Sequence, residues 1–181
     1  MRRTLFRFAI ICVILSSRAT TQSQQTNEGL KPNAEVLISS EGRSRVNEPL
    51  KITLQVENVG KIPFYVTPAV QVFNYLGGFE VVVVAPTGAS VRGGAAAGDF
   101  AGRIDIMEDA KRFVLLAPGA MYGGTIATLT VPMSPGTYRV VGKRIPLLVS
   151  ESAKEKLRSG LPFPVLLDLV ESKPIAVTVT E

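Results

Sequence analysis

Four carboxylates in the middle of the chain are the residues best suited to chemistry: Asp99, Asp105, Glu108 and Asp109. Carboxylate oxygens next to a glycine-rich segment are ligands that Ca²⁺ accepts. The spacing of these acids differs from that of an EF-hand loop, and the basic side chains of Arg103, Lys111 and Arg112 would repel a cation. We therefore expect a solvated loop without a bound metal, and a calcium site is the alternative.

Groups for other kinds of catalysis are scarce. The chain has no histidine, which excludes Ser-His-Asp and Cys-His catalysis and removes the commonest metal ligand. A pair of carboxylates could hydrolyse a glycosidic bond, but no tryptophan is present to stack on a sugar. The glycines from Gly88 to Gly102 lack the G-x-x-x-x-G-K-[ST] spacing of a phosphate-binding loop. The sequence therefore predicts a protein that is not an enzyme and needs no cofactor.

Three aromatic residues surround a pair of glycines in the first half of the chain: Phe73, Tyr75 and Phe79. Aromatic side chains at a loop tip are frequent anchors of protein interfaces, although they also cap hydrophobic cores. We regard these three residues as a candidate contact surface, with a role in the core as the alternative.

The N-terminus has the composition of a secretory signal peptide. Arg2, Arg3 and Arg7 precede an apolar run from Phe8 to Leu15, and small and polar residues follow. This composition predicts cleavage after Ala19. The apolar run is far shorter than the ~20 residues that cross a bilayer, so an uncleaved anchor is the less favoured alternative.

Removal of residues 1–19 changes the charge and the thiol content. These residues carry four of the 20 basic residues and no acidic one, so 16 basic and 15 acidic residues remain and the net charge falls from +5 to +1. We therefore expect no nucleic acid as an electrostatic partner and no stable insertion into a membrane. The single cysteine, Cys12, leaves with the signal, which excludes disulfides and thiolate chemistry. The predicted location is the periplasm or the extracellular space.

The elements that must position the remaining residues are mainly strands. Between positions 50 and 57, apolar and polar residues alternate, and the apolar ones are Leu50, Ile52, Leu54 and Val56. This period of two predicts a strand with one buried face. Asn58 and Gly60 then predict a turn.

Other segments predict further short strands, one helix and one long loop. The additional strand segments are Ala34 to Ser40, the residues between Pro63 and Pro68, Phe79 to Pro86, Phe113 to Leu116, Gly124 to Val131, Gly136 to Lys143 and Ile175 to Val179. Of these, the β-branched run from Phe79 to Pro86 predicts a buried central strand. Ser150 to Gly160 predicts a capped helix, because acids come early and basic residues come late. Thr87 to Gly102 is rich in Gly and Ala and predicts a mobile loop, and Arg103 to Gly119 predicts a partly extended segment.

Two Pro-Gly pairs, Pro118-Gly119 and Pro135-Gly136, flank a threonine-rich run. Because proline fixes φ and glycine permits positive φ, each pair predicts a tight turn between strands. Tyr138 begins the strand after the second turn, where a tyrosine can bury its ring and bond a backbone group with its hydroxyl. This stretch resembles the Pro-Gly-x-Tyr signature of bacterial immunoglobulin-like domains. Segment 50–60 resembles their second strand, and segment 173–181 resembles their last strand.

The strand segments and the single helix predict an all-β fold, a two-layer antiparallel β-sandwich of about seven strands with one short helical insert before the last strand. The resemblance implies that this sandwich is immunoglobulin-like, although the helical insert departs from that group. It covers residues 34–181, which follow a signal peptide (1–19) and a flexible leader (20–33). The chain lacks the core tryptophan and the cysteines of antibody domains, and the resemblance implies no fixed chemistry.

We therefore expect an exported, non-enzymatic module that binds a protein or a cell-envelope component through its loops. One alternative is a protease inhibitor, in which the Gly- and Ala-rich loop enters a protease cleft. A second alternative is an accessory domain that binds carbohydrate or calcium.

Overall fold

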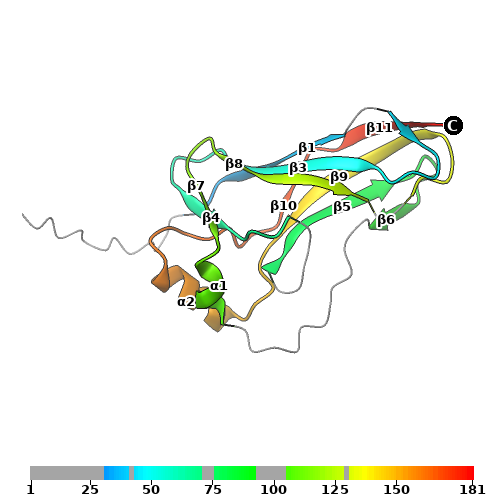
Figure 1. Ribbon diagram of the computed structural model, residues 1–181. Coiled ribbons are helices and arrows are strands. Elements are labelled where there is room, and N and C mark those ends of the chain that lie inside the picture. Colours follow the sequence, from blue (N-terminus) through cyan, green and yellow to red (C-terminus); the bar gives the residue numbers. More distant parts are fainter. Residues whose placement is uncertain (1–30, 41–42, 71–75, 93–104, 129–130) are drawn as a thin grey trace, which may run out of the picture.

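The computed structural model describes residues 31–40, 43–70, 76–92, 105–128 and 131–181. The elements of this part are β1 (Ala34–Ser40), β2 (Ser44–Arg45), β3 (Lys51–Asn58), β4 (Phe64–Val66), β5 (Gly78–Val84), β6 (Ser90–Arg92), α1 (Ile106–Ala110), β7 (Val114–Leu116), β8 (Met121–Ala127), β9 (Gly136–Ile145), α2 (Glu151–Gly160), β10 (Val170–Glu171) and β11 (Ile175–Thr180). Figure 1 shows that strands make up most of the regular secondary structure, with the two helices together at one end. The predicted mainly-β fold is therefore confirmed.

The strands form two larger sheets and one small sheet. The first sheet has the order β1-β3-β8, and the second has the order β2-β11-β9-β5-β6 with β10 also beside β9. The small sheet pairs β4 with β7. Pairing is antiparallel throughout the named strands except between β2 and β11, which run parallel. In Figure 1 the two larger sheets form stacked layers, as expected for a sandwich.

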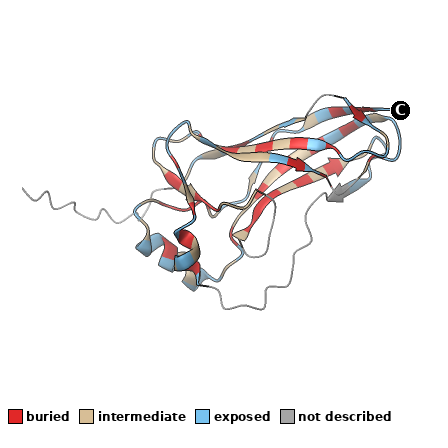
Figure 2. Ribbon diagram, in the orientation of Figure 1, coloured by how far each residue is buried: buried red, intermediate tan, exposed pale blue. Residues whose placement is uncertain are grey.

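The core lies between the two larger sheets and follows the period-two pattern of the sequence. The predicted buried face of this segment is confirmed. Ile52, Leu54 and Val56 of β3 are fully buried, as is Leu50 just before the strand. They belong to one cluster with Val140 of β9 in the opposite sheet. Figure 2 shows the matching alternation of buried and more exposed residues along β3 and β9.

Each Pro-Gly pair lies at a turn, as predicted, and the second turn leads directly into β9. Gly119 (φ 77°) and Gly136 (φ 147°) have positive φ, which a residue with a side chain would adopt only under strain. The ring of Tyr138 is buried, and its hydroxyl donates a 2.9 Å hydrogen bond to the Ser134 carbonyl oxygen. The predicted bond between this tyrosine and the turn is confirmed.

Tyr138→Phe is expected to lower the free energy of unfolding by about 1 kcal/mol, because the ring still packs while the hydrogen bond to Ser134 is lost. Urea unfolding monitored by circular dichroism measures the change. Tyr65→Phe is a suitable control, since the Tyr65 hydroxyl makes no side-chain hydrogen bond within the described ranges. Equal stability of the two variants would contradict a role for the Tyr138 hydroxyl.

Several boundaries differ from the sequence-based expectations. The strand expected from Gly124 to Val131 begins earlier, at Met121, because Glu57 of β3 offers Met121 a partner. Part of the segment expected as a mobile loop is instead strand β6, which pairs with Val82–Val84 of β5. The segment expected to be partly extended contains the helix α1, whose N-terminus is capped by Asp105. The strands β2 and β10 have two residues each, too few to show a period.

The two helices enclose a second, smaller core at one end of the sandwich. The predicted helix is α2, and Ser150 caps it by accepting a hydrogen bond from the Ala153 backbone N–H. Leu157 of α2 is fully buried and clusters with Ile106 of α1. The helical insert therefore packs against the domain and is part of it.

Candidate functional site

The position of Phe79 contradicts the prediction that this residue belongs to an aromatic contact surface. This side chain is 1% exposed and belongs to the main core, so it cannot contact a partner. Phe79 is buried because it shares one face of β5 with Val81 and Val83, and that face packs in the core. Phe73 and Tyr75 lie outside the described residues.

The ring of Phe79 lies beneath a buried arginine, Arg144, which was not predicted from the sequence. The Arg144 Cζ atom is 4.9 Å from the ring centroid, and the residue is 3% exposed. Its Nη1 atom donates a 2.7 Å hydrogen bond to the Ala69 carbonyl oxygen, and its Nη2 atom donates a 2.9 Å bond to the Thr67 carbonyl oxygen. Nη2 also donates to the Thr67 hydroxyl. Arg144 thereby ties β9 to the segment between β4 and β5.

Burial removes Arg144 from water, and no carboxylate of the described residues pairs with it. Within the described ranges no ion pair involves Arg144, since its hydrogen bonds are made to neutral groups. Desolvation lowers the pKa of Arg144 from its ordinary value to about 10, while the Tyr122 hydroxyl raises that pKa by a smaller amount. The side chain therefore stays protonated near neutral pH. Tyr122 holds the same segment by donating a 2.7 Å hydrogen bond to the Pro68 carbonyl oxygen.

The acidic residues considered for calcium have other contacts. The Asp105 carboxylate accepts hydrogen bonds from the Met107 and Glu108 backbone N–H groups at the start of α1. The Glu108 carboxylate forms an ion pair with Lys111 at 2.7 Å. Among the described residues no three metal-ligating side chains lie together. Asp99 lies outside the described residues, as does segment 93–104, which includes most of the loop considered for protease inhibition.

The outward face of the second sheet carries apolar residues that the core does not use. In β5, Val81 and Val83 point into the sandwich, so Val82 and Val84 point outwards and are only half-buried. Val82 is the register partner of Val141 in β9, which is also half-buried. We call Val82, Val84 and Val141 the valine face. The buried central strand expected from this run is therefore buried on one face only.

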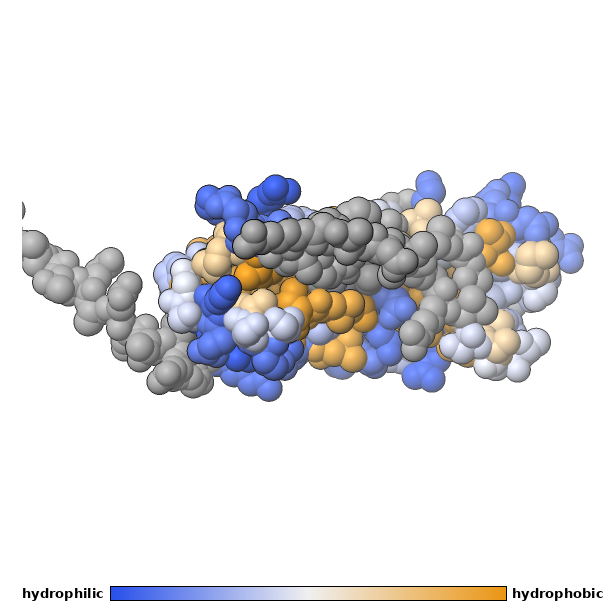
Figure 3. Space-filling view, turned by 90° about the horizontal axis from the view of Figure 1, so that it is seen from below, coloured by the Kyte–Doolittle hydropathy of each residue, from blue (hydrophilic) through white to orange (hydrophobic). Residues whose placement is uncertain are grey.

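Charged and further apolar residues border the valine face. Ile145 of β9 is half-buried on the same side, and the neighbouring Leu169 is 51% exposed. Between them and the valines, Lys143 forms an ion pair with Glu171 at 2.6 Å, and Glu80 is the register partner of Lys143. Figure 3 shows hydrophobic residues gathered beside the helical end on the side of the molecule seen from below. An apolar centre with a charged border is the composition of a protein interface.

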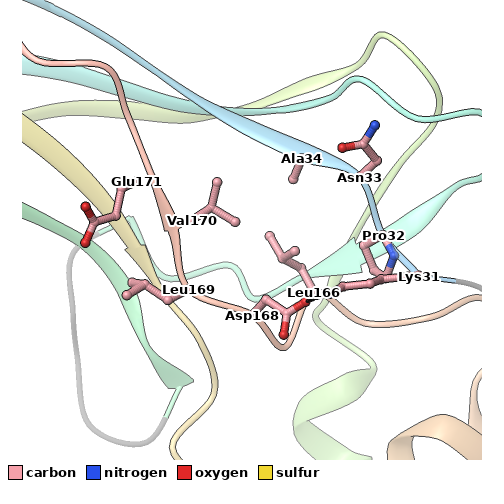
Figure 4. A pocket seen from close by; sticks show the side chains of 9 residues that line it. All are labelled: Lys31, Pro32, Asn33, Ala34, Leu166, Asp168, Leu169, Val170 and Glu171. Carbon is pink, nitrogen blue, oxygen red and sulfur yellow. Dashed lines mark ion pairs between the residues drawn. The ribbon is translucent and has the colours of Figure 1, made fainter.

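A shallow groove of about 530 Å³ lies between the start of β1 and β10. It is lined by Lys31, Pro32, Asn33, Ala34, Leu166, Asp168, Leu169, Val170 and Glu171. Figure 4 shows Lys31 and Asp168 beside each other at one end of the groove and Glu171 at the other. Lys31 and Asp168 form an exposed 3.2 Å ion pair, and Asn33 accepts a backbone hydrogen bond from Val59. The ion pair and this hydrogen bond hold the first described residues against the sandwich, and the charged groups of the groove are exposed.

Neither helix in the described ranges has the length and apolar character needed to cross a membrane. Comparison with known sequences gives no match to a protein-family model or to a curated protein.

Three solved structures show weak likeness to this chain. The CARDB domain of the PF1109 protein from Pyrococcus furiosus, in complex with di-metal ions, has a TM-score of 0.37 at 15% identity, covering 82% of this chain and 94% of that chain. A mutant beta-glucosidase from Listeria innocua in complex with laminaribiose has a TM-score of 0.36 at 14% identity, covering 82% of this chain and 16% of that chain. The beta-glucosidase from the same organism in complex with isofagomine has a TM-score of 0.35 at 15% identity, with coverages of 83% and 17%. All three TM-scores are below 0.5, so this likeness does not establish a shared topology, ligand or activity.

Proposed function

We propose that this chain is an exported, non-enzymatic β-sandwich module that binds a partner protein of the cell envelope through the valine face. The single observation that carries the proposal is the outward, half-buried position of Val82, Val84 and Val141 on the second sheet. The main core already contains the inward residues of the same strands, so the valine face adds nothing to that core. A sheet face that stays apolar on its outer side gains free energy when another surface covers it.

The composition of the valine face and its border indicates the surface that a partner would present. An apolar patch would cover the valines, and polar groups at its border would meet the exposed carboxylate of Glu171 and the ammonium group of Lys143. The two charges are already paired with each other, so they add specificity more than affinity.

We also propose that the arrangement is of the immunoglobulin-like kind. Support comes from the two packed sheets and from the Tyr138 hydroxyl, which bonds back to the turn before its own strand. The parallel pairing of β2 with β11 at the edge of the second sheet is compatible with this class, since mixed pairing is common at sheet edges.

The binding proposal is tested by replacing Val141 with lysine in the exported protein. Photoreactive amino acids placed at Val82 and at Val141 first identify, by cross-linking and mass spectrometry, the envelope protein that this face contacts. We expect Val141→Lys to weaken binding of that purified protein at least about tenfold, because a buried ammonium group would face an apolar surface.

Thr178→Lys is the matched control, since Thr178 is exposed on β11 and lies on the same outward side of the sheet. It should bind as the wild type does. Equal affinity of the Val141 variant, measured on protein whose thermal unfolding is unchanged, would refute the valine face as the binding surface. N-terminal sequencing of the exported protein checks the export itself, and a first residue of Thr20 is expected.

A further inference from the structure

Strand β8 lies at the edge of the first sheet, and this edge supports an inference independent of the proposed function. β8 pairs with β3 on one side, and no strand of the described part lies on its other side. We infer that two copies of this chain associate by antiparallel pairing of their β8 strands, which would join the two first sheets into one continuous sheet.

The hydrogen-bonding pattern shows which groups of β8 are available. The Thr128 backbone N–H donates to the Leu50 carbonyl oxygen at 2.9 Å, and the Asn58 N–H donates to the Ala120 carbonyl oxygen at 3.0 Å. In an antiparallel pair, residues two apart repeat the same pattern. Even-numbered residues of β8 therefore bond to β3, and the backbone groups of the odd-numbered residues point to the open edge: Met121, Gly123, Thr125 and Ala127.

The sequence of β8 carries none of the residues that usually protect an edge strand against pairing. Natural edge strands carry charged residues or proline, or are very short, and these features prevent association. β8 has seven residues, MYGGTIA, with no charge and no proline. The edge strands of the second sheet, β2 and β6, have two and three residues, and β1 at the other edge of the first sheet contacts β10 and β11.

The sequence of β8 is complementary to itself in one register. A two-fold axis at Gly124 would place Gly123 opposite Thr125 of the second copy and Met121 opposite Ala127. Each pair combines a larger side chain with a small one, so no steric conflict arises on the outer face. Because all four outward-pointing residues would then exchange two hydrogen bonds, about eight bonds would join the copies.

Charges on the neighbouring strand are compatible with the same antiparallel register. In β3, Lys51 is the register partner of Ala127 and Glu57 is the partner of Met121. The proposed pairing therefore places Lys51 of one copy and Glu57 of the other on one row, about 14 Å apart at the usual strand spacing. Parallel pairing would instead align like charges. The self-complementary sequence of β8 therefore specifies a second copy more closely than an unrelated strand.

The test combines the molar mass with amide hydrogen exchange at residue resolution. We expect the full chain to reach twice the mass of one chain as its concentration rises, in light scattering coupled to size exclusion. The amides of Gly123 and Thr125 should exchange rapidly at low concentration and slowly at high concentration. A monomer at every concentration, or a dimer whose Gly123 and Thr125 amides stay unprotected, would overturn the inference.

Thr125→Pro removes one outward N–H and leaves the bonds to β3 intact, so it should shift the dimer midpoint to at least tenfold higher concentration. Thr125→Ala is the matched control, because it loses only the 2.7 Å hydroxyl contact with Thr53 and keeps the backbone donor. It should dimerise like the wild type. If Thr125→Pro does not fold, the concentration dependence of exchange in the wild type still decides the question. A partner for the valine face plays no part in this experiment.

Discussion

Arg144→Ala is expected to lower the free energy of unfolding by about 3–5 kcal/mol, the largest effect of a single substitution that we predict. The substitution frees the Thr67 and Ala69 carbonyl oxygens, which have the guanidinium as their donor. It also removes the group that covers the ring of Phe79 and leaves a cavity in its place. Unpaired buried acceptors and a cavity each destabilise a folded protein. Urea unfolding followed by circular dichroism measures the loss.

Two further variants separate the hydrogen bonds of Arg144 from its charge. Arg144→Lys keeps the charge but loses the planar fork that reaches both carbonyl groups, so we expect a smaller loss of about 2 kcal/mol. Lys143→Ala is the control on the opposite side of β9, where only an exposed ion pair with Glu171 is lost, and its effect should be below about 1 kcal/mol. An Arg144→Ala variant as stable as Lys143→Ala would show that the buried arginine does not hold the β4–β5 segment.

The layout of the sandwich was predictable because burial on one face leaves a period in the sequence. Leu50 to Val56 alternate without interruption, and each apolar residue of that stretch is fully buried. Tyr138 was predictable for a different reason, since the Pro-Gly turn before it fixes where β9 begins.

The burial of Arg144 was not predicted, because a charged residue is not expected at the buried positions of an alternating strand. Tyr138, Val140 and Gly142 occupy the inward positions of β9, and Arg144 is the next inward position. Continuing the period past the apolar residues would have placed the side chain in the core. A charged residue at such a position signals a buried polar network, because its donors must find acceptors there.

The short elements depend on contacts that are distant in sequence. Helix α1 has five residues, and its packing on α2 joins positions about 50 residues apart. β10 and β11 are separated by a break at Ser172, whose hydroxyl accepts the Gly142 N–H. Such pairings are decided by the tertiary structure, so local propensity does not reveal them.

The outward valines show a related limit of pattern reading. A run of valines predicts a strand covered on both faces, as in a buried sheet. In β5 one face packs in the core and the other is half-buried on the outside. The valines on the outer face are therefore not required for the core. These outer valines are the reason for proposing that the valine face binds a partner.

Asn58→Ala is expected to lower the free energy of unfolding by about 2–4 kcal/mol. The Asn58 side chain is fully buried at the end of β3, where its Nδ2 donates to the Ile62 and Leu116 carbonyl oxygens at 2.8 and 2.9 Å. Its Oδ1 accepts a 3.0 Å bond from the Gly60 N–H. The turn predicted from Asn58 and Gly60 is thus joined to β7, so alanine would remove three hydrogen bonds, one of them buried and two partly buried. Thermal and urea unfolding measure the loss.

Asn58→Asp tests the direction of these hydrogen bonds through pH. A carboxylate has the shape of the amide but no donor, and it would face two carbonyl oxygens, so we expect this variant to be less stable than Asn58→Ala at neutral pH. Burial and the facing carbonyl groups would raise the pKa of that carboxyl above its unfolded value, so the folded state would bind the proton more tightly. Its stability relative to the wild type must then increase as pH falls through the raised pKa and decrease as pH rises. Asn33→Ala, at an exposed position, should change stability by less than about 0.5 kcal/mol at every pH. A pH-independent difference between Asn58→Asp and the wild type would mean that Asn58 does not donate to these carbonyl groups, and the connection between the turn and β7 would need another cause.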